Sequence, residues 1–526
     1  MNSRTKIEQL SIMARSAMRQ AKWATTARCA REILKLDNVS AEGHFLAGVV
    51  AKAAKQPDTA GKSFRKALQS DKRRYDAAIE LADLYVRLQR NSEAVALLAD
   101  SAPLLGNSPL YLEMAAQAYS RLDMHESARP LYQNACRLQP EIERFQAGLA
   151  ACNVFLGEVS EAREIYLKLL ARYPEHQRFH YELALLATVE SFGHVKQMKS
   201  LLESAALPPE RNIFLYYAIG KELEDLGEWD EAFSYYEKGG LAAKSVSPYD
   251  VTTDLALIDA LIETCDKNWW LGMQPGQSVQ SIGKTPVFIV GLPRTGTTLT
   301  ERIIGSHSQV GSIGETFFLQ SALRQVSGVR TAESMSPEIV RAVAERPMAS
   351  VASRYLSAVS YKLGVEPMFI EKLPENYLYL GFVAKAFPDA RIVHLKRHPL
   401  DACFAMYKQS YFRYAYTLDD VGRYYVAYAG LMDHWRALLG DRLIEVSYES
   451  LVSNQEDETR RLLQRMGIEF ETACLQFERN KASSRTASAV QVREKIHTRS
   501  VGRWKHFERH LKPLTDFLVS NNIALR

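Results

Sequence analysis

Small and bulky apolar side chains recur with a period of 34 residues along the first half of the chain. In each period a small residue is followed four positions later by a bulky one. These pairs are Ala60 and Phe64, Ala94 and Leu98, Ala128 and Tyr132, and Ala162 and Tyr166. A small residue lets two helices approach closely, and a large residue one turn later fills the space beside it. The spacing therefore predicts helix pairs that stack along the chain.

The same pattern continues less regularly in the next part of the chain. Gly220, Ala232 and Tyr236 repeat it with two extra residues, whereas the period around Ala184 is degenerate and predicts a small insertion. This pattern resembles the tetratricopeptide repeat (TPR), so we expect an α-solenoid over residues 5–245. Such arrays present an extended concave surface that commonly contacts peptides or proteins. The periodic residues are mainly core residues and do not specify a function.

The pattern changes after a connector over residues 246–284, which includes a predicted helix near Tyr249–Asp266. PVFIV predicts a strand, GLPRTGTT a tight loop and LTERIIGSH a helix. Backbone N–H groups in such a loop and at the start of the helix can face an anion. Two glycines have the spacing of a Walker A loop, but Thr297 stands where that motif needs lysine. The positive charge lies inside the loop, at Arg294.

Three further apolar runs end in basic or aromatic residues. The segments MFIEKLPENY, ARIVHLKRHPLDACFAMY and RLIEVSYESLV each predict a strand, with Lys372, Arg397 and Tyr448 at the strand ends. Ligands of open α/β sheets bind at the carboxyl ends of the strands. We therefore expect residues 285–526 to form a P-loop-like α/β domain with a parallel sheet, and its site to lie at one edge of that sheet.

The charge of the chain is concentrated in its last segment. The whole chain has 66 Lys and Arg against 61 Asp and Glu, and its formal charge of +5 is too small to indicate a general nucleic-acid or membrane partner. From Lys481 onward, ten basic residues face three acidic ones, so this segment alone carries +7. Its sequence, TASAVQVREKIHTRSVGRWKHF, interleaves Ser, Gln and Trp with Arg and Lys. That composition suits a flap that closes over a polyanion.

Other features bear on metal sites and on location. The six cysteines are scattered without a CxxC pair or a tight Cys/His cluster, so we expect neither a disulfide framework nor a metal site. The N-terminal segment lacks the apolar core of a signal peptide, and no apolar run approaches the ~20 residues that cross a bilayer. These features predict a cytoplasmic protein. His394 falls in the middle of a strand and His398 precedes a proline, so both are expected to have structural roles.

Six segments occur in the order of a known enzyme family: PRTGTT, GSIGET, FIEKLPENY, RHPLD, SYESLV, and TASAVQVR followed by SVGRW. Over about residues 285–512 they resemble the sulfotransferases that use 3′-phosphoadenosine 5′-phosphosulfate (PAPS). With its repeats, the chain is similar to the TPR-containing sulfotransferases of bacteria, and its second half is similar to the tyrosylprotein sulfotransferases. The resemblance implies transfer of a sulfuryl group from PAPS, as a co-substrate and without a metal ion, to a hydroxyl or phenol acceptor.

The resemblance also implies roles for single residues. Glu315 matches a general base, and Lys372 and Ser488 match groups that stabilise the transition state. Arg294 adds positive charge at the same place. The residues matching nucleotide ligands are Arg294, Thr295, Gly296, Thr297 and Thr298 for the 5′-phosphosulfate, Arg397 for the 3′-phosphate, and Tyr448, Ser488, Gln491, Arg493 and Arg503 for further contacts.

One position departs from the family. The family usually has a serine eight residues after Arg397, where it donates to the 3′-phosphate, and this chain has Ala405. The loss of one hydroxyl donor is expected to weaken nucleotide binding by about 1–2 kcal/mol if nothing replaces it. Lys408, Gln409 or the basic tail could compensate.

The sequence leaves the acceptor open. The Gly-Glu-Thr motif around Glu315 favours the phenol of a peptide tyrosine, recruited by the repeats, and a carbohydrate or small-molecule hydroxyl is the alternative. The aromatic run SYFRYAYTLDD is either helix core or the wall of an acceptor pocket. A second hypothesis, motivated by Ala405, is a non-enzymatic repeat scaffold with a degenerate nucleotide-binding domain. A P-loop kinase is disfavoured by Thr297 and by the lack of a clear Walker B acid.

Overall fold

The computed structural model describes residues 3–205, 207–247, 249–272, 283–331, 334–480, 482–483, 486 and 490–525. The chain divides into two compact units, Met1–Leu156 and Gly157–Arg526. The division falls inside the predicted repeat region, so the second unit holds the later repeat helices together with the α/β region. The predicted domain boundaries at residues 245 and 285 stay a prediction.

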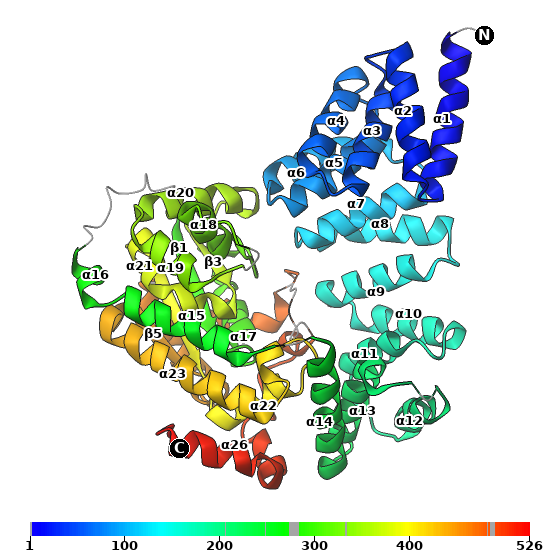
Figure 1. Ribbon diagram of the computed structural model, residues 1–526. Helices are drawn as coiled ribbons and strands as arrows, with labels where there is room; N and C mark the ends of the chain where they lie inside the picture. Colours follow the sequence, from blue (N-terminus) through cyan, green and yellow to red (C-terminus); the bar gives the residue numbers. More distant parts are fainter. Residues whose placement is uncertain are drawn as a thin grey trace. The chain divides into compact units, whose positions relative to one another are not determined.

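The first unit is built from helices that pack against their neighbours in the sequence, as α1 packs on α2, α3 on α4 and α7 on α8 (Figure 1). Its helices are α1 (Ser3–Arg19), α2 (Trp23–Leu36), α3 (Ala41–Ala53), α4 (Pro57–Ser70), α5 (Tyr75–Arg87), α6 (Asn91–Ser101), α7 (Pro109–Arg121), α8 (His125–Leu138) and α9 (Glu143–Leu156). The small and bulky residues of the 34-residue period are buried, six of them in this unit and Ala162 and Tyr166 in the second, and none is more than 5% exposed. The predicted helical repeat is confirmed.

The second unit begins with helices α10 (Val159–Arg172), α11 (Gln177–Leu186), α12 (Gly193–Ala205), α13 (Ile213–Asp225), α14 (Trp229–Val246), α15 (Val251–Thr264) and α16 (Lys267–Gly272). The degenerate period around Ala184 lies on α11, and an irregular segment separates α11 from α12. Helix α15 corresponds to the helix predicted in the connector. The Asp250 carboxylate caps it, because it accepts a hydrogen bond from the Thr252 backbone N–H at 2.9 Å.

A parallel sheet of five strands forms the centre of the α/β region, in the order β2-β3-β1-β4-β5. The strands are β1 (Thr285–Gly291), β2 (Val310–Ser312), β3 (Met368–Lys372), β4 (Arg391–Lys396) and β5 (Leu443–Ser447). Four of them are the predicted strands, and the short β2 was not predicted. The predicted parallel sheet is confirmed.

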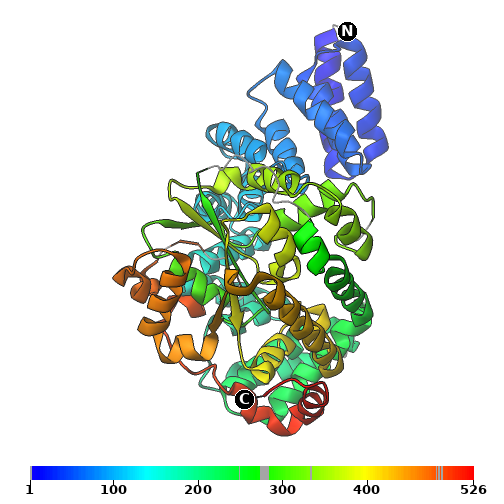
Figure 2. The same ribbon diagram turned by 90° about the vertical axis from the view of Figure 1, so that its left-hand side faces the viewer.

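Helices cover both faces of this sheet (Figure 2). The remaining helices are α17 (Thr297–Ile304), α18 (Phe318–Ser327), α19 (Pro337–Ala344), α20 (Met348–Val359), α21 (Leu380–Ala386), α22 (Pro399–Tyr407), α23 (Leu418–Leu439), α24 (Tyr448–Ser453), α25 (Gln455–Met466) and α26 (Glu508–Ser520). Val287 and Ile289 of β1 pack toward α17 and α25. Phe288 and Val290 pack in the opposite core, with α20, α21 and α23. Because both faces are mainly apolar, a ligand site is expected at the ends of the strands.

The strand order places the predicted site residues at one edge of the sheet. The central strand β1 pairs with β3 on one side and β4 on the other, with Ile289 opposite Lys372 and Gly291 opposite Leu395. The chain therefore leaves β1, β3 and β4 at the same carboxyl edge. Ligands of open α/β sheets bind at such a point, where neighbouring strands connect in opposite directions.

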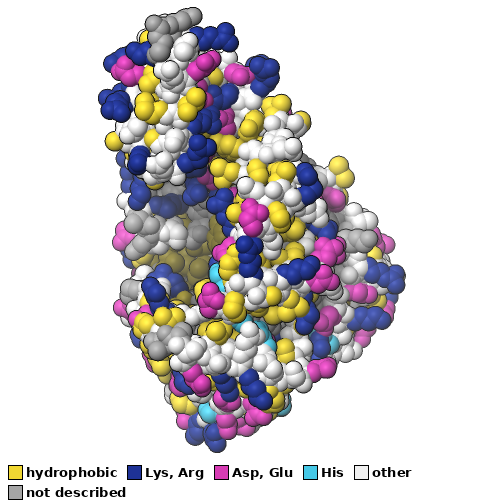
Figure 3. Space-filling view, turned by 90° about the vertical axis from the view of Figure 1, so that its right-hand side faces the viewer, with side chains coloured by type: hydrophobic (Ala, Val, Ile, Leu, Met, Phe, Trp, Pro, Cys, Tyr) yellow, Lys and Arg dark blue, Asp and Glu magenta, His cyan; other side chains and the backbone are white. Residues whose placement is uncertain are grey.

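The surface carries both charged and apolar side chains. Charged side chains of both signs and apolar side chains share the face shown in Figure 3. Within the ranges that the structure describes, no helix is long and apolar enough to cross a membrane.

Replacing Gly48 with valine is expected to destabilise the first unit. A Cβ atom at Gly48 on α3 would lie 2.5 Å from the Phe64 ring on α4. Overpacking of this kind costs about 1–3 kcal/mol, so Gly48→Val should lower the first thermal unfolding transition followed by circular dichroism. Gly430→Val is the matched control, because a Cβ at this exposed position of α23 meets no neighbouring side chain. Equal unfolding temperatures for Gly48→Val and the wild type would contradict the packing described here.

Candidate functional site

The loop after β1 has a backbone that turns sharply to expose its N–H groups. Gly291, Arg294 and Gly296 have φ values of +149°, +68° and +96°. A Cβ at Gly291 would lie 2.6 Å from the Leu395 carbonyl oxygen, so only glycine fits against β4 there. The Thr295 hydroxyl donates to the Leu292 carbonyl at 2.6 Å and braces the turn. Helix α17 then starts at Thr297, with the first N–H groups of the helix at the loop.

The C-terminal tail returns to this loop. An Arg294 guanidinium nitrogen donates to Gln491 Oε1 at 3.0 Å, and the Thr298 hydroxyl lies 3.4 Å from the Thr486 hydroxyl. Gln491 belongs to a short 3₁₀ helix, η8 (Gln491–Arg493). The tail therefore contacts the loop, and its predicted role as a flap over a polyanion stays a prediction.

Arg397 lies directly after β4 and ties three segments together. It donates to the Arg294 carbonyl at 2.7 Å and to the Ser500 carbonyl in the tail. Its guanidinium lies 4.9 Å from the centre of the Tyr448 ring. Burial lowers the pKa of Arg397. Its Nε atom is buried and has no hydrogen-bond partner among the described residues, so one donor is left for a ligand.

Tyr448 also closes one side of the loop. A Cβ at Gly296 would lie 2.6 Å from the Tyr448 ring, so the ring packs directly on the backbone of the loop. The loop glycine, the Tyr448 ring and the Arg397 guanidinium thus form a continuous surface at the carboxyl edge of the sheet.

A buried ion pair lies at the end of β3. Lys372 is fully buried, and its Nζ donates to the Glu315 carboxylate and lies 3.6 Å from Glu301 Oε2. The Ser312 hydroxyl donates to Glu301 Oε1 at 2.7 Å. Burial opposes the charged form of Lys372, but the two facing carboxylates outweigh it, so the pKa of the ammonium is raised. Lys372 is therefore a cation with a base candidate, Glu315, directly against it.

Two further carboxyl groups belong to the chain segment that carries Lys372. Desolvation raises the pKa of Glu375 to about 7, and the neighbouring Glu315 carboxylate adds to the effect. Burial also raises the pKa of Glu371, on β3, to about 7. Glu371 accepts a hydrogen bond from the Thr316 hydroxyl at 2.6 Å, which anchors the Gly-Glu-Thr turn to the sheet.

Three predicted ligands lie elsewhere or outside the described residues. Arg503 Nε donates to Glu224 on α13 at 2.9 Å and not to the loop. Arg493 packs its guanidinium on Gly157 and donates to the Ala482 carbonyl at 3.3 Å. Ser488 lies outside the described residues. The structure thus gathers Arg294, the loop threonines, Glu315, Lys372, Arg397, Tyr448 and Gln491 at one edge.

Sequence reasoning missed three acidic residues: Glu301, Glu375 and Glu224. Glu301 lies one helical turn after Thr297, on the face of α17 that follows the loop, and that spacing was a usable signal. Nothing in the sequence pairs Glu224 with Arg503, 279 positions away. The histidines have the structural roles predicted for them. His394 is buried and hydrogen-bonds the Tyr428 hydroxyl, and His398 stacks on the Trp504 ring.

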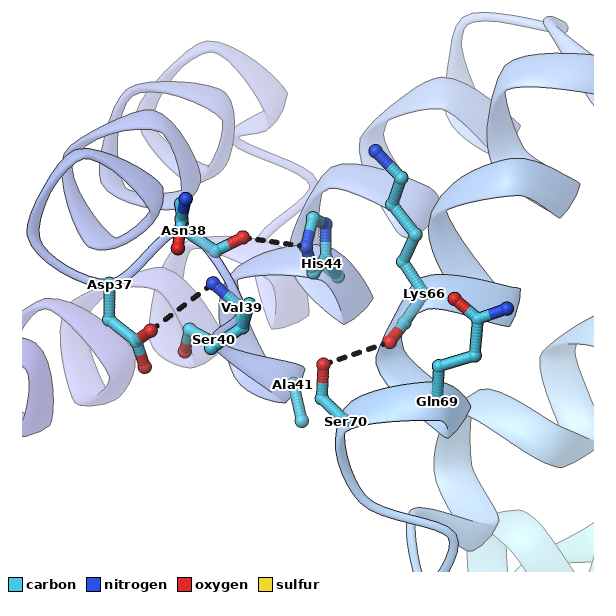
Figure 4. A pocket seen from close by; sticks show the side chains of 9 residues that line it. All are labelled: Asp37, Asn38, Val39, Ser40, Ala41, His44, Lys66, Gln69 and Ser70. Carbon is cyan, nitrogen blue, oxygen red and sulfur yellow. Dashed lines mark hydrogen bonds between the residues drawn. The ribbon is translucent and has the colours of Figure 1, made fainter.

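A separate surface pocket lies in the first unit. It has a volume of about 720 Å³ and is lined by Asp37, Asn38, Val39, Ser40, Ala41, His44, Lys66, Gln69 and Ser70 (Figure 4). His44 Nε2 is hydrogen-bonded to the Asn38 carbonyl at 3.0 Å, and Asp37 accepts from the Val39 N–H. It contains none of the predicted site residues. Among the described residues, no three His, Cys, Asp or Glu side chains are grouped to hold a metal ion.

Comparison with known proteins identifies both parts of the chain. A sulfotransferase family model matches residues 286–472, and tetratricopeptide repeat models match residues 51–118 and 148–176. Parts of the first half are therefore similar to tetratricopeptide repeats, and residues 286–472 are similar to the sulfotransferase family. The loop, Lys372 and Arg397 all lie within the sulfotransferase match, and the resemblance inferred from the six motifs is confirmed.

The relatives of this chain are distant. An uncharacterised protein of Aquifex aeolicus (strain VF5) is 29% identical over 392 residues, which cover 72% of this chain and 51% of that protein. A putative protein-tyrosine sulfotransferase of Caenorhabditis briggsae is 24% identical over 41% of this chain and 80% of its own length. The chain thus spans about half of the Aquifex protein. A solved sulfotransferase domain from the curacin biosynthetic pathway has 14% identity and a TM-score of 0.31 over 44% of this chain and 98% of its own.

Glu371→Gln is expected to flatten the pH dependence of stability. The pKa of Glu371 in the folded state, about 7, exceeds its ordinary value of 4.5, so the folded chain holds a proton that the unfolded chain releases. This contribution to stability is complete below the ordinary value and is lost as the pH rises through about 7. Denaturant unfolding between about pH 5 and about pH 8 should show a steeper decline for the wild type than for Glu371→Gln.

The exposed Glu345 supplies the control for this experiment. Glu345→Gln should keep the decline of the wild type. Parallel pH profiles for Glu371→Gln and the wild type would contradict the assigned environment of Glu371.

Proposed function

We propose that the chain is a PAPS-dependent sulfotransferase that moves a sulfuryl group to a hydroxyl or phenol acceptor. The observation that carries the proposal is the buried Lys372 ammonium held against Glu315 at the strand ends, beside the phosphate-type loop. Sulfuryl transfer needs positive charge at the leaving phosphate and a base at the acceptor oxygen. A buried cation and a carboxylate in contact at this edge supply both. The match to the sulfotransferase family model supports the same reaction class.

The described residues fit a nucleotide with two phosphate groups. The Tyr448 ring packs on the loop backbone at Gly296, and the N–H groups at the start of α17 suit the 5′-phosphosulfate. Arg397 retains an unpartnered buried Nε donor among the described residues and suits the 3′-phosphate. Tyr448, Gln491, Arg493, Arg503 and Ser488 stay proposed as further nucleotide contacts.

In the proposed reaction the acceptor oxygen attacks sulfur in line with the leaving oxygen. Glu315 takes the acceptor proton as the new S–O bond forms. The bond between sulfur and the bridging oxygen breaks, and its electron pair stays on the 5′-phosphate of the departing adenosine 3′,5′-bisphosphate. In this proposal, Lys372, Arg294 and the loop N–H groups stabilise the negative charge that grows there. The proposal invokes no metal ion.

The proposed acceptor is a protein or peptide tyrosine that the repeats recruit. Tetratricopeptide arrays commonly contact peptides. Relatives of Drosophila melanogaster and Danio rerio are described as protein-tyrosine sulfotransferases, and one of Caenorhabditis briggsae as a putative protein-tyrosine sulfotransferase. These relatives support a phenol over a carbohydrate hydroxyl as the acceptor.

Glu315→Gln tests the base. The variant keeps the size of the side chain but cannot take a proton, so turnover of PAPS should fall by roughly 10²–10⁴-fold while binding of adenosine 3′,5′-bisphosphate is retained. Transfer of ³⁵S from labelled PAPS to peptide and lysate acceptors measures the first quantity, and calorimetry the second. Glu366→Gln, a half-buried carboxyl group at the opposite ends of the strands, is the control and should keep full turnover. Turnover near the wild-type level in Glu315→Gln would rule out Glu315 as the base.

Arg294→Ala tests the loop. Loss of a charge-assisted contact to a phosphate costs about 1.5–3 kcal/mol, so the affinity for adenosine 3′,5′-bisphosphate should fall by about 10–100-fold in calorimetry. Arg346→Ala, at an exposed arginine of the same domain, should leave the affinity unchanged. Unchanged affinity in Arg294→Ala would mean that the loop does not bind the nucleotide.

A further inference from the structure

A cluster of charges around one buried carboxylate joins a repeat helix to the C-terminal tail. Glu224, on α13, is 4% exposed, and Lys408 Nζ donates to its two carboxylate oxygens at 2.7 and 2.9 Å. Arg503 Nε donates to Glu224 Oε1 at 2.9 Å, and the Tyr236 hydroxyl donates to Glu224 Oε2 at 2.7 Å. Three donors from α14, the end of α22 and the tail therefore converge on one carboxylate of the repeat segment.

Helix α22 links this cluster to the candidate site. Lys408 is the residue directly after α22, and Ala405 lies one turn earlier on the same face, half-exposed and without a polar group. At the start of the helix, the Asp401 carboxylate accepts hydrogen bonds from the Gly502 N–H at 2.7 Å and the Trp504 N–H at 3.0 Å. The tail residues on either side of Arg503 are thus fixed to the helix that begins beside Arg397.

The cluster has an excess of positive charge. Lys408 and Arg503 share the single Glu224 carboxylate, and the charge of Arg294 also acts on Lys408. The Arg503 guanidinium lies 4.8 Å from the centre of the Trp229 ring of α14, which holds it on the repeat segment. Two cations that share one counter-ion near a phosphate-type loop suit an anion supplied from outside the chain.

We propose that Glu224 is a positioning residue of the donor site, which holds Lys408 and Arg503 so that Lys408 contacts the 3′-phosphate of the nucleotide. Lys408 then supplies the contact on the face of α22 where Ala405 has no donor. This inference rests on the proposed function, because it assumes that the nucleotide is the donor of the sulfuryl group. It makes a carboxylate of the repeat segment part of the donor site, in addition to any role of the repeats in recruiting the acceptor.

The surroundings of Lys408 explain why the carboxylate is needed. Burial lowers the pKa of Lys408, the Glu224 carboxylate counters this, and the positive charges of Arg503 and Arg294 add to the lowering. The Phe404 ring lies 5.2 Å from the ammonium, and the Tyr236 hydroxyl completes the cluster. Without the negative charge of Glu224, the pKa of Lys408 falls further, and the ammonium loses its proton at a lower pH. Glu224→Gln should therefore lose affinity for the phosphate as the pH rises.

The experiment compares two nucleotides on the full-length chain. Adenosine 3′,5′-bisphosphate and adenosine 5′-phosphate differ only in the 3′-phosphate, so the ratio of their dissociation constants isolates that group. Lys408→Met and Glu224→Gln should each lower this preference by about tenfold or more, as expected for a charged hydrogen bond. The loss in Glu224→Gln should grow with pH, and Glu224→Asp should restore part of the preference. Lys408→Met/Ala405→Ser should recover part of it as well.

Glu222→Gln is the matched control. Glu222 lies on the same helix and is 1% exposed, but it is hydrogen-bonded to His194 instead of Lys408. The control should keep the preference for the 3′-phosphate even if it loses thermal stability. An unchanged preference in Lys408→Met, or equal losses in Glu222→Gln and Glu224→Gln, would overturn the inference while leaving the proposed function intact. A wild-type chain that binds neither nucleotide and transfers no sulfate would overturn the proposed function and the inference with it.

Discussion

The candidate site depends on the ion pairs that the buried Lys372 ammonium makes with two carboxylates. Lys372 ends a central strand and is fully buried, and a charge in such a place is tolerated only when it is paired. Its two carboxylates come from different segments: Glu301 from the helix after the loop, and Glu315 from the turn after β2. One ion pair therefore fixes the positions of the loop helix, the Gly-Glu-Thr turn and β3 relative to one another. The same contact leaves a base candidate beside a cation, which is the arrangement that sulfuryl transfer needs.

A second constraint is the set of hydrogen bonds that holds the C-terminal tail against the loop and α22. Arg397 donates to the loop and to the tail, while Asp401, four residues later, accepts from the tail backbone. The tail is therefore held on the same edge as the loop, although the two are about 200 residues apart in the sequence. Glu224 extends this network into the repeat helices of the second unit. The repeat helices and the α/β region of that unit are joined by ion pairs to the buried Glu224 carboxylate as well as by apolar packing.

Much of this architecture could be predicted from periodicity. The 34-residue spacing identified the buried small and bulky residues, and the apolar runs identified four strands with Lys372, Arg397 and Tyr448 at their ends. Strand β2 was not predicted, because a strand of three residues is too short to show a recognisable pattern of apolar positions. The ion pairs of Lys372 with Glu301 and of Glu224 with Arg503 were not predicted either. Residue type alone does not show which charged residues, distant in the sequence, come into contact in the folded chain. The catalytic roles follow from the family resemblance and the geometry together, and they remain proposals.

The most direct measurement is a crystal structure of the full-length chain with adenosine 3′,5′-bisphosphate. The account predicts the 5′-phosphate within hydrogen-bond distance of the backbone N–H groups of Gly296–Thr298, with the Lys372 ammonium on the side where the sulfuryl group is transferred. It also predicts the 3′-phosphate beside Arg397. A nucleotide bound with both phosphates away from this edge of the sheet would contradict the account.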